Sequence, residues 1–156
     1  MYFTFIEHEL KFKGELLYIQ DEYSLLYKPW NTNVGFAIIC GEYTALDTIC
    51  ETGRIVHISG LNSKHLWVAK ELKMPKAKTG ELFAHFDEPP LKGSGLDYNK
   101  SWKTYYDNDS SCICIGNPQL EPHDEYVEFA HETVAVLRSG QIIAVWAKIK
   151  EVETLQ

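Results

Sequence analysis

The chain has 156 residues, of which 45% are hydrophobic and 24% are charged, and its formal net charge is −7. This length suits one globular domain spanning residues 1–156, and the composition excludes the low hydrophobicity and high charge of disordered chains. The acidic excess argues against direct binding to nucleic acid, whose phosphates repel carboxylates, and favours a basic protein partner.

Residues 2–12, YFTFIEHELKF, are typical of a β-strand. A basic segment, an apolar run and a small-residue cleavage site do not follow one another here, so we expect no signal peptide. No stretch approaches the roughly 20 apolar residues that cross a bilayer. We therefore expect a cytoplasmic protein that does not contact membranes.

Short strands separated by turns follow this first segment. GELLYIQDEYSLLYKP predicts a hairpin that turns at residues 20–22, and Pro29 ends its second strand because proline cannot donate to a ladder. NVGFAIICGEYTALDTIC predicts one or two apolar strands. TICETGRIVHISG predicts a further hairpin, whose turn contains Gly53, a residue that adopts a positive φ at low cost.

One helix is expected, in NSKHLWVAKELKMP. Its Asn-Ser pair can cap the start, Leu66, Ala69 and Leu72 recur at helical spacing, and Pro75 ends the pattern. We expect a helix near residues 63–73 that packs on the sheet through these three apolar side chains.

The strand predicted by GELFAHF is followed by an unusual stretch, residues 87–111. It is rich in glycine, proline, serine and aspartate, yet it carries four aromatic rings that solvated loops normally avoid. We expect a loop over residues 87–101 and then a hairpin that turns near residues 108–109. At least one ring, that of Tyr98 or Tyr105, is expected to remain accessible.

The last third predicts three antiparallel strands in EYVEFAHETVAVLRSGQIIAVWAKIK, with tight turns at residues 131–132 and 139–140. Its β-branched residues suit the buried centre of a sheet. The predicted fold class is therefore α+β, a single domain dominated by an antiparallel β-sheet with one main helix.

Motifs for catalysis or cofactor binding are weak. Cys112 and Cys114 form a C-x-C pair whose sulfurs share one face of a strand, but no second pair completes a zinc signature, so buried thiols are favoured. His123 and His131 lie among carboxylates and are candidates for a general acid or base. We expect no metal, no cofactor and no catalytic residue.

A run of carboxylates lies in QLEPHDEYVEFAHE, residues 119–132, which contains no Lys or Arg. It is either a solvated loop with an outward strand face or an acidic patch that pairs with lysine and arginine on a partner. The candidate partner-binding residues, from this run and from the aromatic stretch before it, are Asp97, Tyr98, Tyr105, Asp107, Asp109, Glu121, Asp124, Glu125 and Glu128.

In size, acidity and lack of an export signal, and in the segments DYNKSWKTYYDND and EPHDEYVEFAHE, the chain resembles small acidic bacterial immunity proteins. These are encoded beside contact-dependent-inhibition and other polymorphic toxins. The resemblance implies a cytosolic inhibitor that occludes the active or nucleic-acid-binding surface of a cationic nuclease-type toxin. It rests on no diagnostic motif and transfers no functional residue.

Two other classes of function stay open. The protein could bind a small molecule in a cavity closed by residues 87–101, or it could be a small hydrolase that uses His123 or His131 with a carboxylate. For the inhibitor, an exposed strand edge could also accept a hairpin from the partner, and the sequence does not identify that edge.

Overall fold

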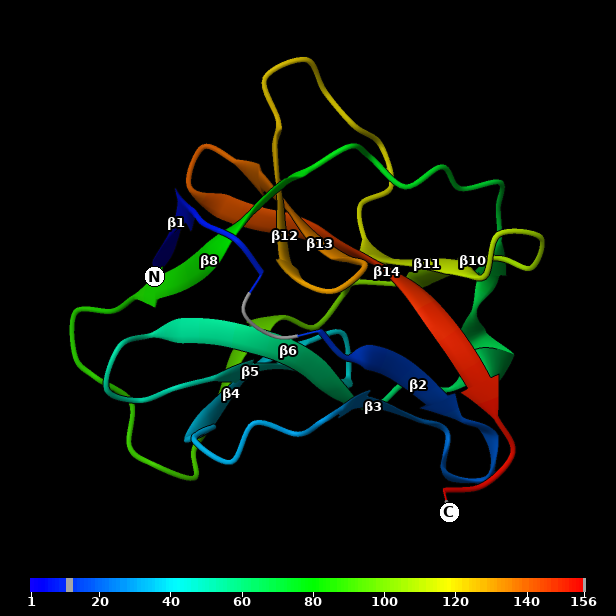
Figure 1. The fold of residues 1–156 in the computed structure, drawn as a ribbon, viewed down its shortest axis with the longest axis horizontal. Helices are drawn as coiled ribbons and strands as arrows, with labels where there is room; N and C mark the ends of the chain where they lie inside the picture. Colours follow the sequence, from blue (N-terminus) through cyan, green and yellow to red (C-terminus); the bar gives the residue numbers. More distant parts are fainter. Residues whose placement is uncertain (11–12, 156) are drawn as a thin grey trace.

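The structure is a computed structural model, and it describes residues 1–10 and 13–155. Its regular structure consists of β-strands and two single 3₁₀ turns, η1 (Gln20–Glu22) and η2 (Lys64–Leu66) (Figure 1). The strands are β1 (Tyr2–Glu7), β2 (Glu15–Ile19), β3 (Ser24–Lys28), β4 (Phe36–Cys40), β5 (Tyr43–Thr48), β6 (Arg54–Leu61), β7 (Val68–Ala69), β8 (Lys78–His85), β9 (Gly95–Asn99), β10 (Thr104–Asp107), β11 (Cys112–Gly116), β12 (Glu125–Ala130), β13 (Thr133–Arg138) and β14 (Gln141–Val152).

The strand pairings close on themselves. The path β8, β12, β13, β14, β2, β3 and β6 returns to β8, because β6 also pairs with β8. Three extensions leave this ring: β1 from β8, the series β5, β4 and β9 from β6, and the series β11, β10 and β7 from β14. The pairs β14–β2, β12–β8, β4–β9 and β10–β7 are parallel, so the sheet is mixed.

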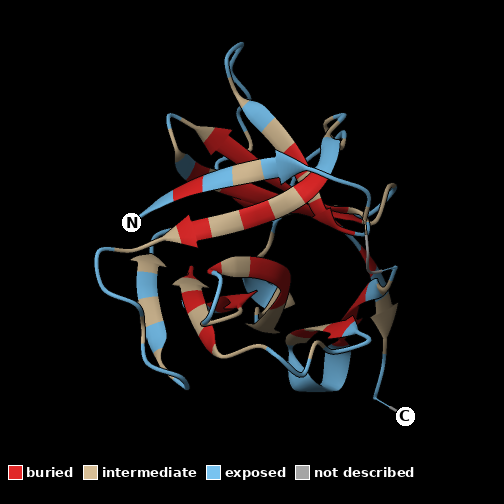
Figure 2. Ribbon diagram, turned by 60° about the vertical axis from the view of Figure 1, so that its left-hand side comes forward, coloured by how far each residue is buried: buried red, intermediate tan, exposed pale blue. Residues whose placement is uncertain are grey.

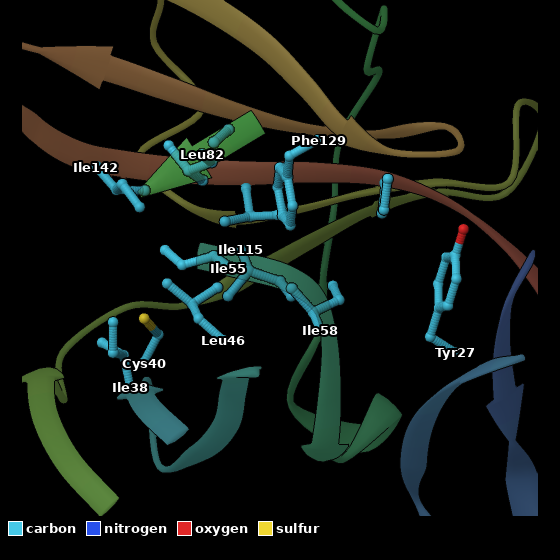
Figure 3. Packing of buried hydrophobic residues seen from close by; sticks show 14 of the residues in the cluster. Tyr27, Ile38, Cys40, Leu46, Ile55, Ile58, Leu82, Ile115, Phe129 and Ile142 are labelled. Carbon is cyan, nitrogen blue, oxygen red and sulfur yellow. The ribbon is translucent and has the colours of Figure 1, made fainter. Parts of the chain in front are cut away.

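The larger hydrophobic cluster fills the space between the two sides of the ring. Figure 3 shows Leu82, Phe129 and Ile142 on one side of this cluster and Ile55 and Ile58 of β6 on the other. Burial of such a side chain stabilises the fold by about 1.5–3 kcal/mol. Figure 2 shows many buried residues along the central strands, and β11 and β13 are buried over almost their whole length.

The strand β14 is buried on both of its faces. Val145, Ala147 and Ile149 belong to the larger cluster, whereas Ala144 and Trp146 belong to a second cluster on the other face. Side chains alternate between the faces of a strand, so one strand joins both cores. This confirms the prediction that the last three strands form the centre of the sheet.

The predicted hairpins and the predicted C-terminal meander are confirmed. The β2–β3 hairpin turns at η1, and β3 ends one residue before Pro29. The β5–β6 turn contains Gly53 with φ of +75°. The hairpin of β10 and β11 and the meander of β12, β13 and β14 also turn where the sequence predicts, with positive φ at Glu132 and Ser139.

The expected helix near residues 63–73 is wrong, and with it the α+β fold class. Only η2 is helical there, and the chain then runs extended through β7, parallel to β10. Its main-chain groups bond to other segments: the Lys70 N–H donates to the Tyr106 carbonyl, and the Leu72 N–H donates to the Asp107 carboxylate. Tertiary partners thus replace the intrahelical hydrogen bonds that the apolar spacing suggested.

The helical spacing of Leu66, Ala69 and Leu72 does not correspond to a shared buried face. Leu66 is exposed and Ala69 is exposed, whereas Leu72 is buried in the second cluster, so these three side chains do not share one face. The loop expected over residues 87–101 also contains a strand, β9, which adds to β4. Residues 11 and 12, in the first predicted strand segment, lie outside the described residues.

Candidate interaction site

A hollow of about 440 Å³ lies where the end of β6 and η2 meet the start of β5 and the start of β10. Tyr43 and Leu66 line it with 62% and 71% of their surface exposed, and Tyr23 and Leu61 also line it as exposed residues. We call this hollow the aromatic groove and define it by these four side chains. Large apolar side chains exposed together are unusual on a folded surface and mark interaction sites.

A close main-chain approach brings two of these residues together. Tyr43 of β5 pairs with Leu61 of β6. Their neighbour Gly60 has φ of +103°, and a Cβ atom there would lie 2.2 Å from the Tyr43 carbonyl oxygen. Only glycine suits this combination of positive φ and close contact. Gly60 is therefore needed for the close approach that brings Tyr43 and Leu61 together.

Asn62 anchors the floor of the groove. Its amide nitrogen donates to the hydroxyls of Thr44 (3.2 Å) and Thr104 (2.8 Å), and its amide oxygen accepts from the Trp67 indole N–H (2.7 Å). The Tyr18 hydroxyl donates to the Asn62 carbonyl at 2.8 Å. These bonds connect four separate segments and fix the groove before any partner binds.

Tyr23 is held in a strained conformation at the rim. It has φ of +53°, which is uncommon for a residue with a Cβ atom. The conformation is held by main-chain hydrogen bonds: the Tyr23 N–H donates to the Gln20 carbonyl, and the Asn62 N–H donates to the Tyr23 carbonyl at 2.7 Å. These bonds close the turn η1 and keep the exposed Tyr23 ring at the rim of the groove.

Lys64 attaches the η2 segment to the last strand. Its ammonium contacts the Glu151 carboxylate and lies 4.8 Å from the centre of the Tyr106 ring. Burial raises the pKa of Tyr106, and the nearby Glu151 carboxylate raises it further. The Tyr106 ring in turn packs against Trp67, which lines the groove.

Charges of both signs border the groove. Glu42 lines it and is exposed, and Asp21 and Glu22 are exposed in η1 next to Tyr23. Lys100 and Lys103 also line the groove. The Lys100 ammonium is already paired with the Asp97 carboxylate at 3.0 Å.

The aromatic rings of residues 87–111 are mostly used inside the protein. The Tyr98 hydroxyl donates to the Ile142 carbonyl at 2.9 Å and lies 2.9 Å from the Gln141 amide oxygen, and its ring packs edge-on against Phe3 and Trp102. Burial raises the pKa of Tyr98 to about 12. Tyr105 is half-buried against the second cluster.

The acidic candidates before residue 110 are partly bonded within the protein and partly exposed. Asp97 is exposed and paired with Lys100. Asp107 accepts the N–H groups of Leu72 (2.9 Å) and Asp109 (3.0 Å), and the Leu72 N–H is the main cause that lowers the Asp107 pKa. The Asp109 side chain lies in the exposed β10–β11 turn.

Among the candidates after residue 120, Asp124 and Glu121 contact the Arg138 guanidinium. The guanidinium donates to both oxygens of Asp124, at 2.8 and 2.9 Å, and lies 3.3 Å from Glu121. Only 1% of the Asp124 side chain is exposed, and the Arg138 hydrogen bonds lower its pKa. Glu128 accepts the Glu132 N–H, while Glu125 is exposed.

The structure does not bring all nine candidates to one patch. Strands β11, β14 and β13 separate β10 from β12, which is about 19 Å along the sheet at the usual strand spacing. The groove residues Tyr23, Tyr43, Leu61 and Leu66 were not predicted. Tyr23 and Tyr43 each follow acidic turn residues, the same conflict between turn composition and aromatic content that marked residues 87–111.

A buried histidine–aspartate pair also escaped prediction. His57 Nδ1 lies 2.8 Å from Asp47 Oδ2, and His57 Nε2 accepts the Asn31 N–H at 3.2 Å. The ring is packed between Tyr27 and Trp30. A catalytic histidine needs a free nitrogen facing a nucleophile, and both nitrogens here are occupied, so the pair anchors the segment after β3.

The histidines and cysteines considered as catalytic or metal-binding residues do not line the groove. His123 is exposed, and His131 Nε2 lies 3.0 Å from Glu132 on the surface. Cys112 and Cys114 are buried free thiols on one face of β11, as predicted, and burial raises the pKa of Cys112 to about 11. Within residues 1–10 and 13–155, no three His, Cys, Asp or Glu side chains form a group suited to a metal ion.

Comparison with known proteins gives no family for this chain. No protein-family model matches it, and no curated protein matches it. Among the described residues, no helix has the length and apolar character needed to cross a membrane.

Proposed function

We propose that the chain is a cytosolic protein-binding inhibitor of the immunity-protein kind, which covers the active or nucleic-acid-binding surface of a cationic nuclease-type toxin. The observation that carries the proposal is the aromatic groove, where Tyr23, Tyr43, Leu61 and Leu66 are exposed together. Tyrosine-rich, apolar centres with a polar rim are typical of protein interfaces.

The rigidity of the groove supports tight binding. The Asn62 side chain satisfies its own polar atoms and those of Thr44, Thr104 and Trp67 inside the protein. A partner would therefore contact mainly the apolar tips, and little conformational entropy would be lost on association. Each large side chain that the partner covers contributes about 1.5–3 kcal/mol of burial.

The charge distribution supports a basic partner. The net charge of −7 attracts cationic surfaces over distances of about one Debye length, roughly 8 Å at physiological salt. Asp21, Glu22 and Glu42 beside the groove are placed to orient such a surface during encounter. Asp109 and Glu125 remain exposed and add to the long-range attraction.

The apolar part of the proposal is tested with Tyr43→Ala and Leu66→Ala. A basic protein that co-purifies from the source cells, and whose gene neighbours that of this chain, serves as the partner. Loss of either side chain should weaken the affinity about tenfold or more, measured by surface plasmon resonance. Leu91→Ala is the matched control, because Leu91 is 81% exposed and does not line the groove.

Affinities unchanged in both groove variants, or reduced equally in the Leu91 control, would contradict the proposal. Failure to recover any basic partner under conditions that keep the protein folded would also contradict it. Circular dichroism of each variant shows whether the strands remain intact.

The acidic part is tested by charge reversal. The double change Asp21→Lys and Glu22→Lys should slow association several-fold and flatten its dependence on salt, because the carboxylates steer the basic partner. Glu51→Lys is the control, since Glu51 is exposed at the opposite end of β5 from Tyr43. The pair Asp109→Lys and Glu125→Lys tests the acidic residues predicted from the sequence in the same assay.

A small molecule is the second candidate ligand, favoured by the volume of the groove, which lies in the range of ligand pockets. Residues 87–101 do not close it, since Lys100 is their only residue in the lining. A thermal-shift screen should then find a ligand whose effect disappears in Tyr43→Ala. A screen without such a ligand removes this candidate.

A further inference from the structure

Three of the described strands pair on one side only: β1, β7 and β9. An unpaired edge presents free N–H and C=O groups to any extended chain, and natural proteins usually protect it with charges, proline, glycine, bulges or short length. The three edges differ in this protection, which identifies the one available to a partner.

The edges of β7 and β9 are protected. β7 has two residues and is followed by Lys70 and Lys73. β9 begins at Gly95, carries the exposed ion pair of Asp97 with Lys100 at its end, and is interrupted by a bulge in its pairing with β4. Neither presents a regular, uncharged row of main-chain groups.

The edge of β1 lacks these features. Its sequence, YFTFIE, contains no lysine, arginine, proline or glycine, and its pairing with β8 runs without a bulge. Tyr2 and Ile6 on its outer face are 55% and 59% exposed. The strand β1 is thus a regular, bulge-free edge strand. Figure 2 shows it as a mostly exposed strand, and Thr4 lies between the exposed Tyr2 and Ile6 on its outer face.

The hydrogen-bond pattern shows which main-chain groups point outward. The His8 N–H donates to the carbonyl of Thr79 in β8. Bonding alternates along an antiparallel pair, so the even-numbered residues of β1 face β8, and Phe3, Phe5 and Glu7 face away from it. The Phe3 N–H donates outward to the Gly140 carbonyl at 2.8 Å, which agrees with this alternation.

No main-chain partner is found among the described residues for the outward N–H groups of Phe5 and Glu7. We propose that β1 accepts an extended, basic segment of the partner protein as an additional strand. The proposal rests on the proposed function and names a second contact surface, on a different strand from those of the groove. It also assigns the strand edge that the sequence left unidentified.

Charge selects this occupant over a second copy of the chain. Glu7 and Glu9 are exposed at the carboxyl end of β1, where a lysine or arginine of the added strand would meet them. Glu7 already contacts Lys78 at 3.3 Å, but both side chains are exposed and such pairs exchange partners easily. A second copy would bring another net charge of −7 to the same place.

The test uses a capped hexapeptide of alternating lysine and valine, and the same peptide with N-methylated valines as its control. Binding to the full chain is followed by the amide resonances of a nitrogen-15 labelled sample. We expect the unmodified peptide to shift and protect the Phe5 and Glu7 amides, and the methylated peptide to leave them unchanged, because added strands bind through main-chain hydrogen bonds.

Two variants isolate the main-chain group. Glu7→Pro removes the outward N–H, and proline is tolerated at such an edge position. Glu7→Ala removes the same carboxylate and keeps the N–H. The peptide should bind Glu7→Pro about tenfold more weakly than Glu7→Ala.

Equal affinities of these two variants, or peptide-induced shifts confined to other strands, would overturn the proposal. A concentration-dependent dimer in light scattering that Glu7→Pro abolishes and Glu7→Ala keeps would also overturn it, in favour of a second copy. Groove variants at Tyr43 do not alter β1, so failure of this proposal and failure of the proposed function give different results.

Discussion

The acidic segment of residues 119–132 and the aromatic groove are both surface regions, but they use their side chains in opposite ways. In the acidic segment, Arg138 and main-chain N–H groups engage Glu121, Asp124 and Glu128. In the groove, internal hydrogen bonds engage the polar atoms and leave Tyr43 and Leu66 exposed. The number of charges in a segment therefore does not measure how many are available to a partner.

The difference has a physical cause. A carboxylate that leaves water must receive hydrogen bonds in exchange, so the nearly buried Asp124 requires Arg138. An exposed apolar side chain has no such requirement, and it persists at the surface wherever the fold offers nothing to cover it. Availability to a partner is decided by what the rest of the fold supplies.

The largest expected effect comes from removing the internal support of the groove. Asn62→Ala leaves the Trp67 indole N–H and the hydroxyls of Thr44 and Thr104 without this partner. We expect the free energy of unfolding to fall by about 2–3 kcal/mol, together with weaker partner binding, because the groove loses its floor. Urea unfolding and plasmon resonance measure the two effects.

Tyr43→Ala is the control that separates the effect on stability from the effect on binding. Loss of this exposed ring should weaken partner binding with little change in the free energy of unfolding. If Asn62→Ala is as stable as the wild type, the groove is not held by this network, and the contrast between the two regions is lost.

An intermediate effect is expected at Asp124, and it depends on pH. Its pKa is lowered from 3.8 in the folded state by Arg138, so this carboxylate stabilises the fold above pH 3.8 and loses that contribution as the pH falls through the lowered value. Asp124→Asn should reduce the free energy of unfolding by about 1–2 kcal/mol at pH 7. The gap to the wild type should narrow as the pH falls below 3.8 and the acid form of Asp124 accumulates.

Guanidinium unfolding at several pH values measures this gap. Asp109→Asn is the control, because Asp109 is exposed and should show no such narrowing. A gap that stays constant between neutral and acidic pH would mean that the Asp124–Arg138 pair does not stabilise the fold.

The smallest expected effect is at Tyr98. Tyr98→Phe removes the hydrogen bond to the Ile142 carbonyl and keeps the ring, so the free energy of unfolding should fall by about 1 kcal/mol while partner affinity stays the same. Thermal unfolding and plasmon resonance measure both quantities. A loss of affinity without a loss of stability would instead make Tyr98 a contact residue, as the sequence predicted.

Local signals were sufficient for much of the fold. Alternating apolar residues and turn residues such as Gly53 predicted hairpins that the structure contains, because both strands of a hairpin and its turn lie within a short segment. The strands β7 and β9 were missed. Each pairs in parallel with a strand distant in sequence, and no local pattern encodes such a partner.

The candidate site was less accessible to prediction. Nine residues were selected by charge or aromatic character, and several of them, including Tyr98 and Asp124, are engaged within the protein. The groove residue Leu66 was assigned to the core because its spacing matched a helix. The assignment of Leu66 was wrong, and the nine candidates remain a prediction, because composition and spacing do not report which side chains the fold covers.

By itself, the sequence determined the alternation of strands and turns, the acidic charge and the buried C-terminal meander, because these depend on neighbours within a few residues. Only the tertiary structure decided that residues 63–73 run extended, that Arg138 neutralises Asp124, and that β1 is an open edge. These features depend on contacts between segments far apart in the chain, where hydrogen bonds and burial outweigh local preference.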